Sequence, residues 1–409
     1  MTFFPLPLEQ IFGTWGQYVV YLIIGIAFGA VLEMAGFGKS TRLAAQFYFK
    51  DLTVLKVMFT GIVVAMLFIF LATGLGLLDY NLIWVNPTYM VPGIVGGLIM
   101  GVGFIVGGFC PGTSLVGAVT GKIDAIFFSL GACFGIFVFG ESVGGFEQFF
   151  NSTYMGRYTL MDMFDTSAGV IVISVVLMAI IAFLFAEQAE RIFGKRDLKR
   201  EPKWRYGVAG GGVVLAAAVA FIGQPTTADK WARLEPDKAK LLIERAILID
   251  PAELLSLTQN RQVKLVMLDV RSEAEYNLFH IRDAQSLPLE RVMEQIETLQ
   301  QNPSNTVVVV MSNDETRAVE AWKLLVAESV ANAYILGGGI NNWISTYADA
   351  EFLSKYPPVN GGNDILKYDF REALGARYTA AAPNPDHFVI PFEEKVKLSL
   401  KRGAKGGCG

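Results

Sequence analysis

The chain has 409 residues, 53% of them hydrophobic, and its mean hydropathy of +0.42 excludes an ordinary soluble protein. A net charge of −4 argues against a protein that binds nucleic acid. The three cysteines, Cys110, Cys133 and Cys408, are too few and too scattered for a disulfide framework or a zinc site, and we expect neither a metal nor another cofactor. Residues 1–10 lack a basic region, so no cleavable signal peptide is expected.

Hydropathy changes along the chain. Almost all the long apolar runs lie in the first half, and the rest has the charge pattern of a soluble protein. We therefore expect a polytopic α-helical membrane domain joined to a soluble α/β domain. The predicted parts are the membrane domain 1–222, a linker 223–247, the soluble domain 248–347 and a C-terminal extension 348–409.

Six stretches of the first part are long and apolar enough to cross a bilayer, because a span needs about 20 residues. The last of them is the shortest and is rich in small residues. The predicted spans lie at about 17–35, 54–78, 90–109, 123–141, 167–186 and 206–222.

Positive charge in the connecting loops predicts the orientation. Lys and Arg gather in 36–51 and 187–205 and are absent from 79–89, which places the basic loops in the cytoplasm. The protein is then a multi-pass protein of the cell inner membrane with its N-terminus outside. If 206–222 crosses the membrane, the soluble domain is periplasmic.

The membrane part contains an internal repeat. A shift of 72 positions places Gly25 and Gly29 on Gly97 and Gly101, and it places the turn 36–38 on the turn 108–110. One such glycine pair indicates close helix packing, whereas a duplicated unit with interruptions at matching places is typical of transporters. Because each unit holds two spans, we expect parallel copies.

The interruption in the second copy carries polar chemistry. It reads Gly107-Gly108-Phe109-Cys110-Pro111-Gly112-Thr113-Ser114. Proline suits the first position of a helix, so we predict a short helix at about 111–121 with Cys110 at its N-terminus. Backbone N–H groups and the helix dipole favour a bound anion there, and the two hydroxyls add donors. The alternative is a buried structural cysteine. Cys133, by contrast, is expected only to pack.

This segment, with a degenerate copy upstream, resembles the YeeE/YedE family of sulfur-compound transporters over about 20–145. The resemblance implies uptake of thiosulfate or a related anion, with cysteines in short re-entrant segments. It also implies that Cys110 contacts the substrate, although the first copy has Gly38 where a thiol is expected and Lys39 in place of proline. The expected substrate-binding residues are Gly108, Cys110, Pro111, Gly112, Thr113 and Ser114, with Gly36, Gly38 and Lys39 of the first copy.

Partners follow from the same resemblance. Larger members of the family carry more of these units, so this chain is expected to be half of a transporter, completed by a homodimer or by a partner membrane subunit. The remaining partners are the sulfur-containing anion and membrane lipid. Glu33, an ionisable residue within a span, is a functional candidate by default. We prefer the interpretation that it reaches back to Lys39 or Arg42.

The soluble domain alternates strands and helices, which predicts a mainly parallel sheet. Strands are expected at 263–271 and 306–312, a helix at 318–329, and a strand, turn and helix start at 332–345. The domain resembles a rhodanese, and its His280 is expected to be structural. The resemblance is carried by Asp269-Val270-Arg271, Glu275-Tyr276, His280-Ile281, Leu287-Pro288, Leu336 with Gly338-Gly339, and Trp343.

The catalytic loop departs from the rhodanese pattern. The resemblance implies a cysteine at the strand end with an arginine five residues later, but here Ser312 precedes Arg317. A serine cannot form a persulfide, and Asp314 and Glu315 add negative charge to a loop that should bind anions. We expect no catalysis of sulfur transfer from this loop, while binding, docking and regulation remain open.

Three functions are therefore considered. The first is transport of a reduced-sulfur anion with an accessory domain. The second is a membrane-anchored sulfurtransferase in which Cys408, flanked by glycines in a flexible tail, carries the sulfur. The third is a non-catalytic subunit of a sulfur-metabolising membrane complex.

Overall fold

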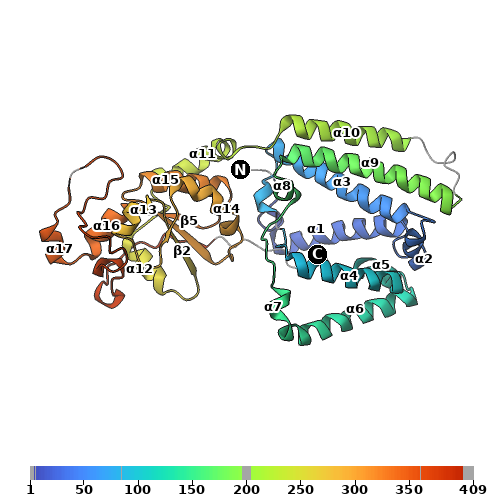
Figure 1. Ribbon diagram of the computed structural model, residues 1–409, viewed down its shortest axis with the longest axis horizontal. Helices are drawn as coiled ribbons and strands as arrows, with labels where there is room; N and C mark the ends of the chain where they lie inside the picture. The colour runs from blue at the N-terminus through green and yellow to red at the C-terminus, as the bar shows by residue number, and fades with distance from the viewer. Residues whose placement is uncertain (1–3, 5, 84, 196–203, 360, 399–409) are drawn as a thin grey trace. The chain divides into compact units, whose positions relative to one another are not determined.

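A computed structural model describes residues 4, 6–83, 85–195, 204–359 and 361–398 (Figure 1). These residues form two compact units, one running to Gln224 and the other starting at Pro225. The first unit is helical throughout, and the second contains a parallel sheet. This confirms the predicted fold class. Cys408 lies outside the described residues.

The membrane unit contains six helical segments long and apolar enough to span a bilayer, which confirms the six predicted spans. The region 206–222 forms a helix like the others, and the protein is a multi-pass membrane protein. The spanning helices are α1 (Leu8–Met34), α3 (Thr53–Gly74), α4 (Met90–Gly107) followed by α5 (Pro111–Val119), α6 (Ile123–Ser142), α9 (Ala168–Phe193) and α10 (Trp204–Ile222). Shorter helices are α2 (Ser40–Ala45), α7 (Glu147–Phe150) and α8 (Leu160–Phe164).

Three of the long helices, α3, α9 and α10, lie side by side (Figure 1). Small residues permit the close approach, since a Cβ added at Gly169 of α9 would lie 2.9 Å from the Cα of Ala220 in α10. A buried carboxylate joins the cytoplasmic ends predicted for α3 and α9. The side chain of Glu190 accepts hydrogen bonds from the Leu52 amide at 2.6 Å and from the Lys56 ammonium at 2.7 Å. This carboxylate therefore stabilises the start of α3.

The internal repeat has a structural counterpart. Each copy is a long helix, a glycine turn, a short helix and a second long helix, as α1–α2–α3 and α4–α5–α6. Gly36 and Gly108 occupy the same place in the two copies, and both have left-handed backbone, with φ of 82° and 71°. The phenylalanines that follow them, Phe37 and Phe109, are both buried in one apolar cluster. The two copies therefore pack against each other at their breaks.

The second unit is built on a five-stranded parallel sheet in the order β1-β5-β4-β2-β3. Its central strand β4 (Thr306–Met311) is buried along its whole length, as an unbroken apolar run predicts. The predicted strands and helices are present within a few residues of the expected bounds. The other elements are β1 (Leu248–Ile249), β2 (Lys264–Asp269), β3 (Gln285–Ser286), β5 (Ala333–Leu336), α12 (Pro251–Gln259), α13 (Glu273–Leu278), α14 (Val292–Gln300), α15 (Thr316–Ala327), α16 (Gly339–Tyr347) and α17 (Ala350–Lys355).

Segments on both sides of this sheet complete the second unit. The predicted linker contains a helix, α11 (Thr227–Ile243), which contacts α15 through a T-shaped pair of Trp231 and Trp322 with ring centroids 5.9 Å apart. The extension after α17 has little regular structure, but it packs on the core through Tyr368 and Phe370, both buried. The extension thus contributes to the folded domain in the part that the structure describes.

Candidate functional site

The structure places Cys110 at the N-cap of α5, where the Cys-Pro-Gly-Thr sequence predicts it. The Cys110 amide donates to the Thr113 hydroxyl at 2.9 Å, and the Thr113 amide in turn donates to the Cys110 sulfur at 3.4 Å. This reciprocal cap satisfies two groups that a helix start leaves unpaired. It also fixes the thiol at the positive end of α5.

The neighbours of Cys110 divide into two sets. Pro111 has no amide hydrogen and the Thr113 amide is held by the sulfur, which leaves the Gly112 amide for a ligand. A Cβ added at Gly112 would meet no atom within 4 Å, so the space beside this turn is open. Ser114, in contrast, is buried and contacts the Ser129 hydroxyl of α6 at 3.1 Å. Its role is to hold α5 on α6.

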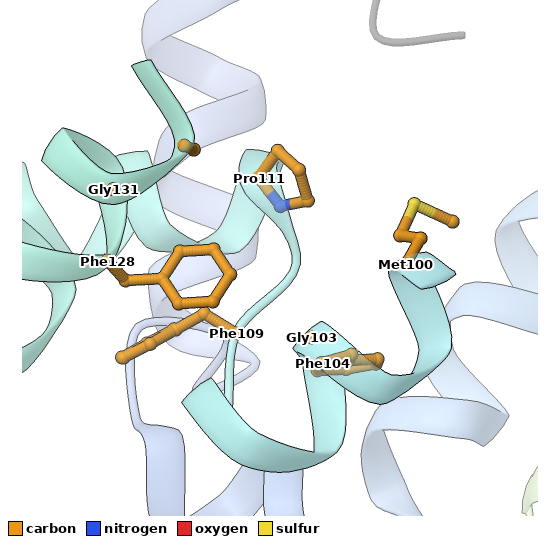
Figure 2. A pocket seen from close by; sticks show the side chains of 8 residues that line it. Met100, Gly103, Phe104, Phe109, Pro111, Phe128 and Gly131 are labelled. Carbon is orange, nitrogen blue, oxygen red and sulfur yellow. The ribbon is translucent and has the colours of Figure 1, made fainter. Parts of the chain in front are cut away.

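A cavity of about 310 Å³ adjoins the start of α5. Figure 2 shows Met100 and Phe104 of α4 on one side, Phe128 and Gly131 of α6 on the other, and Pro111 at the mouth of α5. Its lining is apolar, and Phe109 and Pro111, the two neighbours of Cys110 in sequence, both belong to it. The helix N-terminus therefore stands beside a cavity within the membrane unit.

The first-copy residues lie elsewhere along α5. The Gly38 carbonyl oxygen would be 3.3 Å from a Cβ added at Gly117, two turns along α5 from Cys110. Gly36 forms the left-handed turn beside the Arg42 side chain, and Lys39 is exposed at the N-cap of α2. The structure thus brings the two breaks into contact but does not gather the first-copy residues around the thiol.

One sequence-based interpretation was wrong. The Glu33 carboxylate does not pair with Lys39 or Arg42 but with Lys122, at 3.7 Å, which follows α5 in the second copy. Arg42 pairs instead with Asp51 at 3.3 Å. The error arose because Lys122 is 89 positions from Glu33 in sequence, and only the packing of the two copies brings them together.

Cys133 lies on α6 with its side chain exposed on the surface of the membrane unit, and the expectation that it only packs stays a prediction. Among the described residues no group of three or more His, Cys, Asp and Glu side chains could hold a metal ion.

In the second unit, the loop that follows β4 is closed around Ser312, which is buried. Its hydroxyl accepts a hydrogen bond from the Ala318 amide at 3.2 Å, at the start of α15. Gly339 makes this packing possible, since a Cβ there would lie 2.4 Å from the Ser312 carbonyl oxygen and 2.0 Å from that of Asp314. The glycines of the predicted turn therefore allow close backbone contact with this loop.

The arginine of the loop is fully engaged by carboxylates. Two nitrogens of Arg317 donate to Glu275 at 2.9 and 3.0 Å. Its Nε donates to the carboxylate of Asp364, which belongs to the C-terminal extension. That same carboxylate accepts the Asp314 amide of the loop at 3.1 Å, and the Asp364 amide donates to the Asp314 carboxylate at 2.7 Å. Asp364 therefore contacts both the arginine and a loop amide, the two kinds of group that would bind an anion.

Hydrogen bonds between Glu275 and Arg317 favour the ionised form of both side chains. Burial raises the pKa of Glu275, but hydrogen bonds from Arg317, Ser272 and Asn313 outweigh it and lower the pKa to about 2. Burial lowers the pKa of Arg317, yet the hydrogen bonds to Glu275 and Asp364 raise it above its ordinary value. Glu275 and Arg317 are therefore both ionised at neutral pH. Sequence reasoning missed Asp364, which lies 47 positions from Arg317 in an irregular segment.

Two of the predicted landmarks are structural. His280 stacks on Tyr276 with ring centroids 3.8 Å apart, and its Nδ1 lies 2.8 Å from the Tyr276 carbonyl oxygen. Arg271 and Asp269 form a fully buried ion pair at 2.6 Å, and Arg271 also donates to Asn313 beside Ser312 at 3.1 Å. Arg271 therefore links the buried ion pair to the loop, and His280 packs on Tyr276.

Two family models match the chain. Residues 35–235 match the model described as sulphur transport, and residues 250–346 match the rhodanese-like domain. The chain joins a sulphur-transport family domain to a rhodanese-like domain. This confirms both resemblances seen in the sequence.

The chain is also similar to a curated protein. The chain is 27% identical over 219 residues to the thiosulfate transporter TsuA of Spirochaeta thermophila, a match that covers 51% of this chain and 64% of that protein. The match thus spans less than two thirds of the length of that relative. A crystal structure of a protein from Lactobacillus plantarum is 26% identical, covers 27% of this chain and 93% of its own, and has a TM-score of 0.22.

The contacts of Asp364 predict that it prevents anions from binding at the loop of the rhodanese-like domain. We consider a full-length background in which the three native cysteines are serine, with Ser312→Cys as the only thiol. A thiolate there would take the outer sulfur of thiosulfate and release sulfite, which leaves a persulfide. With Asp364 in place we expect almost no adduct. Asp364→Ala should speed adduct formation at least about tenfold, because a hydrogen bond between charged groups contributes about 1.5–3 kcal/mol. Intact mass after incubation with thiosulfate measures the added sulfur.

Asp369→Ala is the matched control, since this exposed carboxylate lies five residues further along the same segment. It should leave the rate unchanged. Equal adduct formation with and without Asp364 would show that the loop is open to anions.

Proposed function

We propose that this protein carries a small reduced-sulfur anion, such as thiosulfate, across the membrane, and that the anion contacts Cys110 on its way. The observation that carries the proposal is the position of Cys110 at the N-cap of a broken helix, between Phe109 and Pro111, which line an apolar cavity. The similarity to a thiosulfate transporter over half of the chain supports the choice of substrate class. Transporters of other folds likewise place anions at the N-termini of discontinuous helices.

The chemistry of the turn suits such a cargo. Moving a charged group into a membrane protein is costly unless donors replace its water. The Gly112 amide and the positive end of α5 supply this replacement. The Cys110 sulfur accepts the Thr113 amide, so the thiol hydrogen remains available for donation to the anion. Sulfur is also polarizable, which suits a contact with the outer sulfur of thiosulfate.

The rhodanese-like domain has an accessory role in this proposal. Its loop has Ser312 in place of a nucleophilic thiol, and Asp364 occupies the groups that would bind a sulfur anion. We therefore favour docking or assembly over sulfur transfer for this domain. The tail with Cys408 lies outside the described residues, and its role as a sulfur carrier stays a hypothesis.

We place the protein in the inner membrane with the rhodanese-like domain in the periplasm. The support is the distribution of basic residues. Arg191 lies in the last turn of α9 and Lys195 follows it, and Lys39, Arg42 and Lys50 lie between α1 and α3. Because α10 is long enough to cross once more, the chain then leaves the cytoplasm before Pro225.

Cys110→Ser tests the substrate contact without removing the helix cap, because serine caps helix N-termini well. Uptake of labelled thiosulfate by cells that express the protein should fall about tenfold, the equivalent of about 1.4 kcal/mol, because a serine hydroxyl is shorter and less polarizable than the thiol and cannot replace its contact with the outer sulfur. The amount of protein in the membrane should not change. Cys133→Ser, an exposed thiol on α6, is the control and should leave uptake intact. Full uptake by Cys110→Ser would show that the Cys110 thiol is not needed for transport and that this turn only contributes to packing.

Single reporter cysteines test the orientation. In a background without native cysteines, Glu351→Cys on the rhodanese-like domain and Lys50→Cys between α1 and α3 are both exposed positions. A membrane-impermeant maleimide should label Glu351→Cys in intact spheroplasts, and it should label Lys50→Cys only after permeabilisation. The opposite pattern would place the domain in the cytoplasm.

A further inference from the structure

An ion pair lies beside α5, at the end of the helix opposite Cys110. Lys122 follows the last turn of this helix, and its ammonium lies 3.7 Å from the Glu33 carboxylate of the first copy. Neither the ammonium nor the second Glu33 oxygen has a hydrogen-bond partner among the described residues, although both atoms are inaccessible to solvent. The nine residues of α5 rise about 1.5 Å each, so the two ends of this helix are about 13 Å apart.

Gly38 is essential to this arrangement. A Cβ at this position would lie 2.6 Å from the Glu33 carboxylate and 2.8 Å from the Lys122 ammonium. In the repeat, Gly38 is the counterpart of Cys110. The two charges therefore occupy the space that a side chain would need at this position, which explains why the first copy has no thiol. A cation stands at the break of the first copy where the second copy has a cysteine.

A second ion pair in the same unit, between Lys56 and Glu190, serves as a comparison for the pair of Lys122 and Glu33. The Lys56 ammonium lies 2.7 Å from the Glu190 carboxylate, which also accepts the Leu52 amide. Both oxygens of the Glu190 carboxylate therefore accept a hydrogen bond, which offsets the cost of a charge within a membrane protein. Lys122 and Glu33 are farther apart and leave hydrogen-bonding capacity unused. Among the nearby charges, Arg42 binds Asp51, whereas Asp124 accepts the Ser40 hydroxyl and also interacts electrostatically with Lys122.

We propose that Lys122 is a second anion-binding residue of the transport path and that Glu33 is the counter-charge that displaces the anion from it. This inference rests on the proposed function. In the resting protein Glu33 neutralises Lys122. An arriving sulfur anion takes the place of Glu33 on the ammonium, and the return of Glu33 releases it. We therefore expect Lys122 to increase the affinity for the anion and Glu33 to decrease it.

Opposite effects of two substitutions test the proposal. Lys122→Met removes the cation and should raise the half-saturating thiosulfate concentration for uptake about tenfold, the equivalent of about 1.4 kcal/mol. Glu33→Gln keeps the shape but removes the competing charge. It should lower the half-saturating concentration and also lower the maximal rate, because release slows. Lys122→Arg should retain near-normal uptake. Lys50→Met, an exposed cation of the α1–α3 connection, is the control without effect.

The outcomes separate the inference from the proposed function. If both substitutions raise the half-saturating concentration, or both only reduce the protein in the membrane, the pair is a clamp between the copies and the inference fails. If Lys122→Met fails to insert, the sign of the change in Glu33→Gln decides alone. If wild type takes up thiosulfate, Cys110→Ser does not, and both variants behave as wild type, only the inference is overturned. Absence of uptake by wild type overturns the proposed function and the inference with it.

Discussion

The membrane unit depends on the contact between two broken helices. Inside a bilayer a helix break is costly, because the freed backbone groups have no water to bind. Here the break after α4 is satisfied locally by the Cys110–Thr113 cap and is covered by the break after α1, through Phe37 and Phe109. The left-handed glycines turn the chain, and Gly117 allows the first copy to approach α5. The packing of the two breaks thus stabilises the fold, and it also leaves the polar N-terminus of α5 within the membrane unit.

In the rhodanese-like domain the fold is intact, but the groups that would bind an anion are already paired within the chain. Its buried Asp269–Arg271 pair, its parallel sheet and its glycine turn are intact, so the scaffold that would position a nucleophile is present. The groups around the loop are used within the chain, because Arg317 is neutralised by Glu275 and Asp364. The fold of this domain is thus kept although its arginine is not free to bind an anion.

Much of this fold could be predicted from the sequence, because local patterns determine it. Spans follow from uninterrupted apolar length, the start of α5 from the Cys-Pro-Gly-Thr pattern, and β4 from its run of valines. The partner of Glu33 and the Asp364 contact could not be predicted, because each joins residues far apart in sequence through packing that no local pattern encodes. The position of Ser114 was only half predicted: the hydroxyl lies near Cys110 in sequence, yet it faces Ser129.

The central claim is that this chain itself moves a reduced-sulfur anion. Exchange in liposomes tests it most directly, because exchange needs no driving ion. Purified full-length protein would be reconstituted into liposomes loaded with unlabelled thiosulfate, and entry of labelled thiosulfate would be followed over time. The account predicts transient accumulation of label with wild type, accumulation about tenfold slower with Cys110→Ser, and none with empty liposomes. Correctly inserted wild-type protein that accumulates no label would contradict the claim that this chain is sufficient for transport.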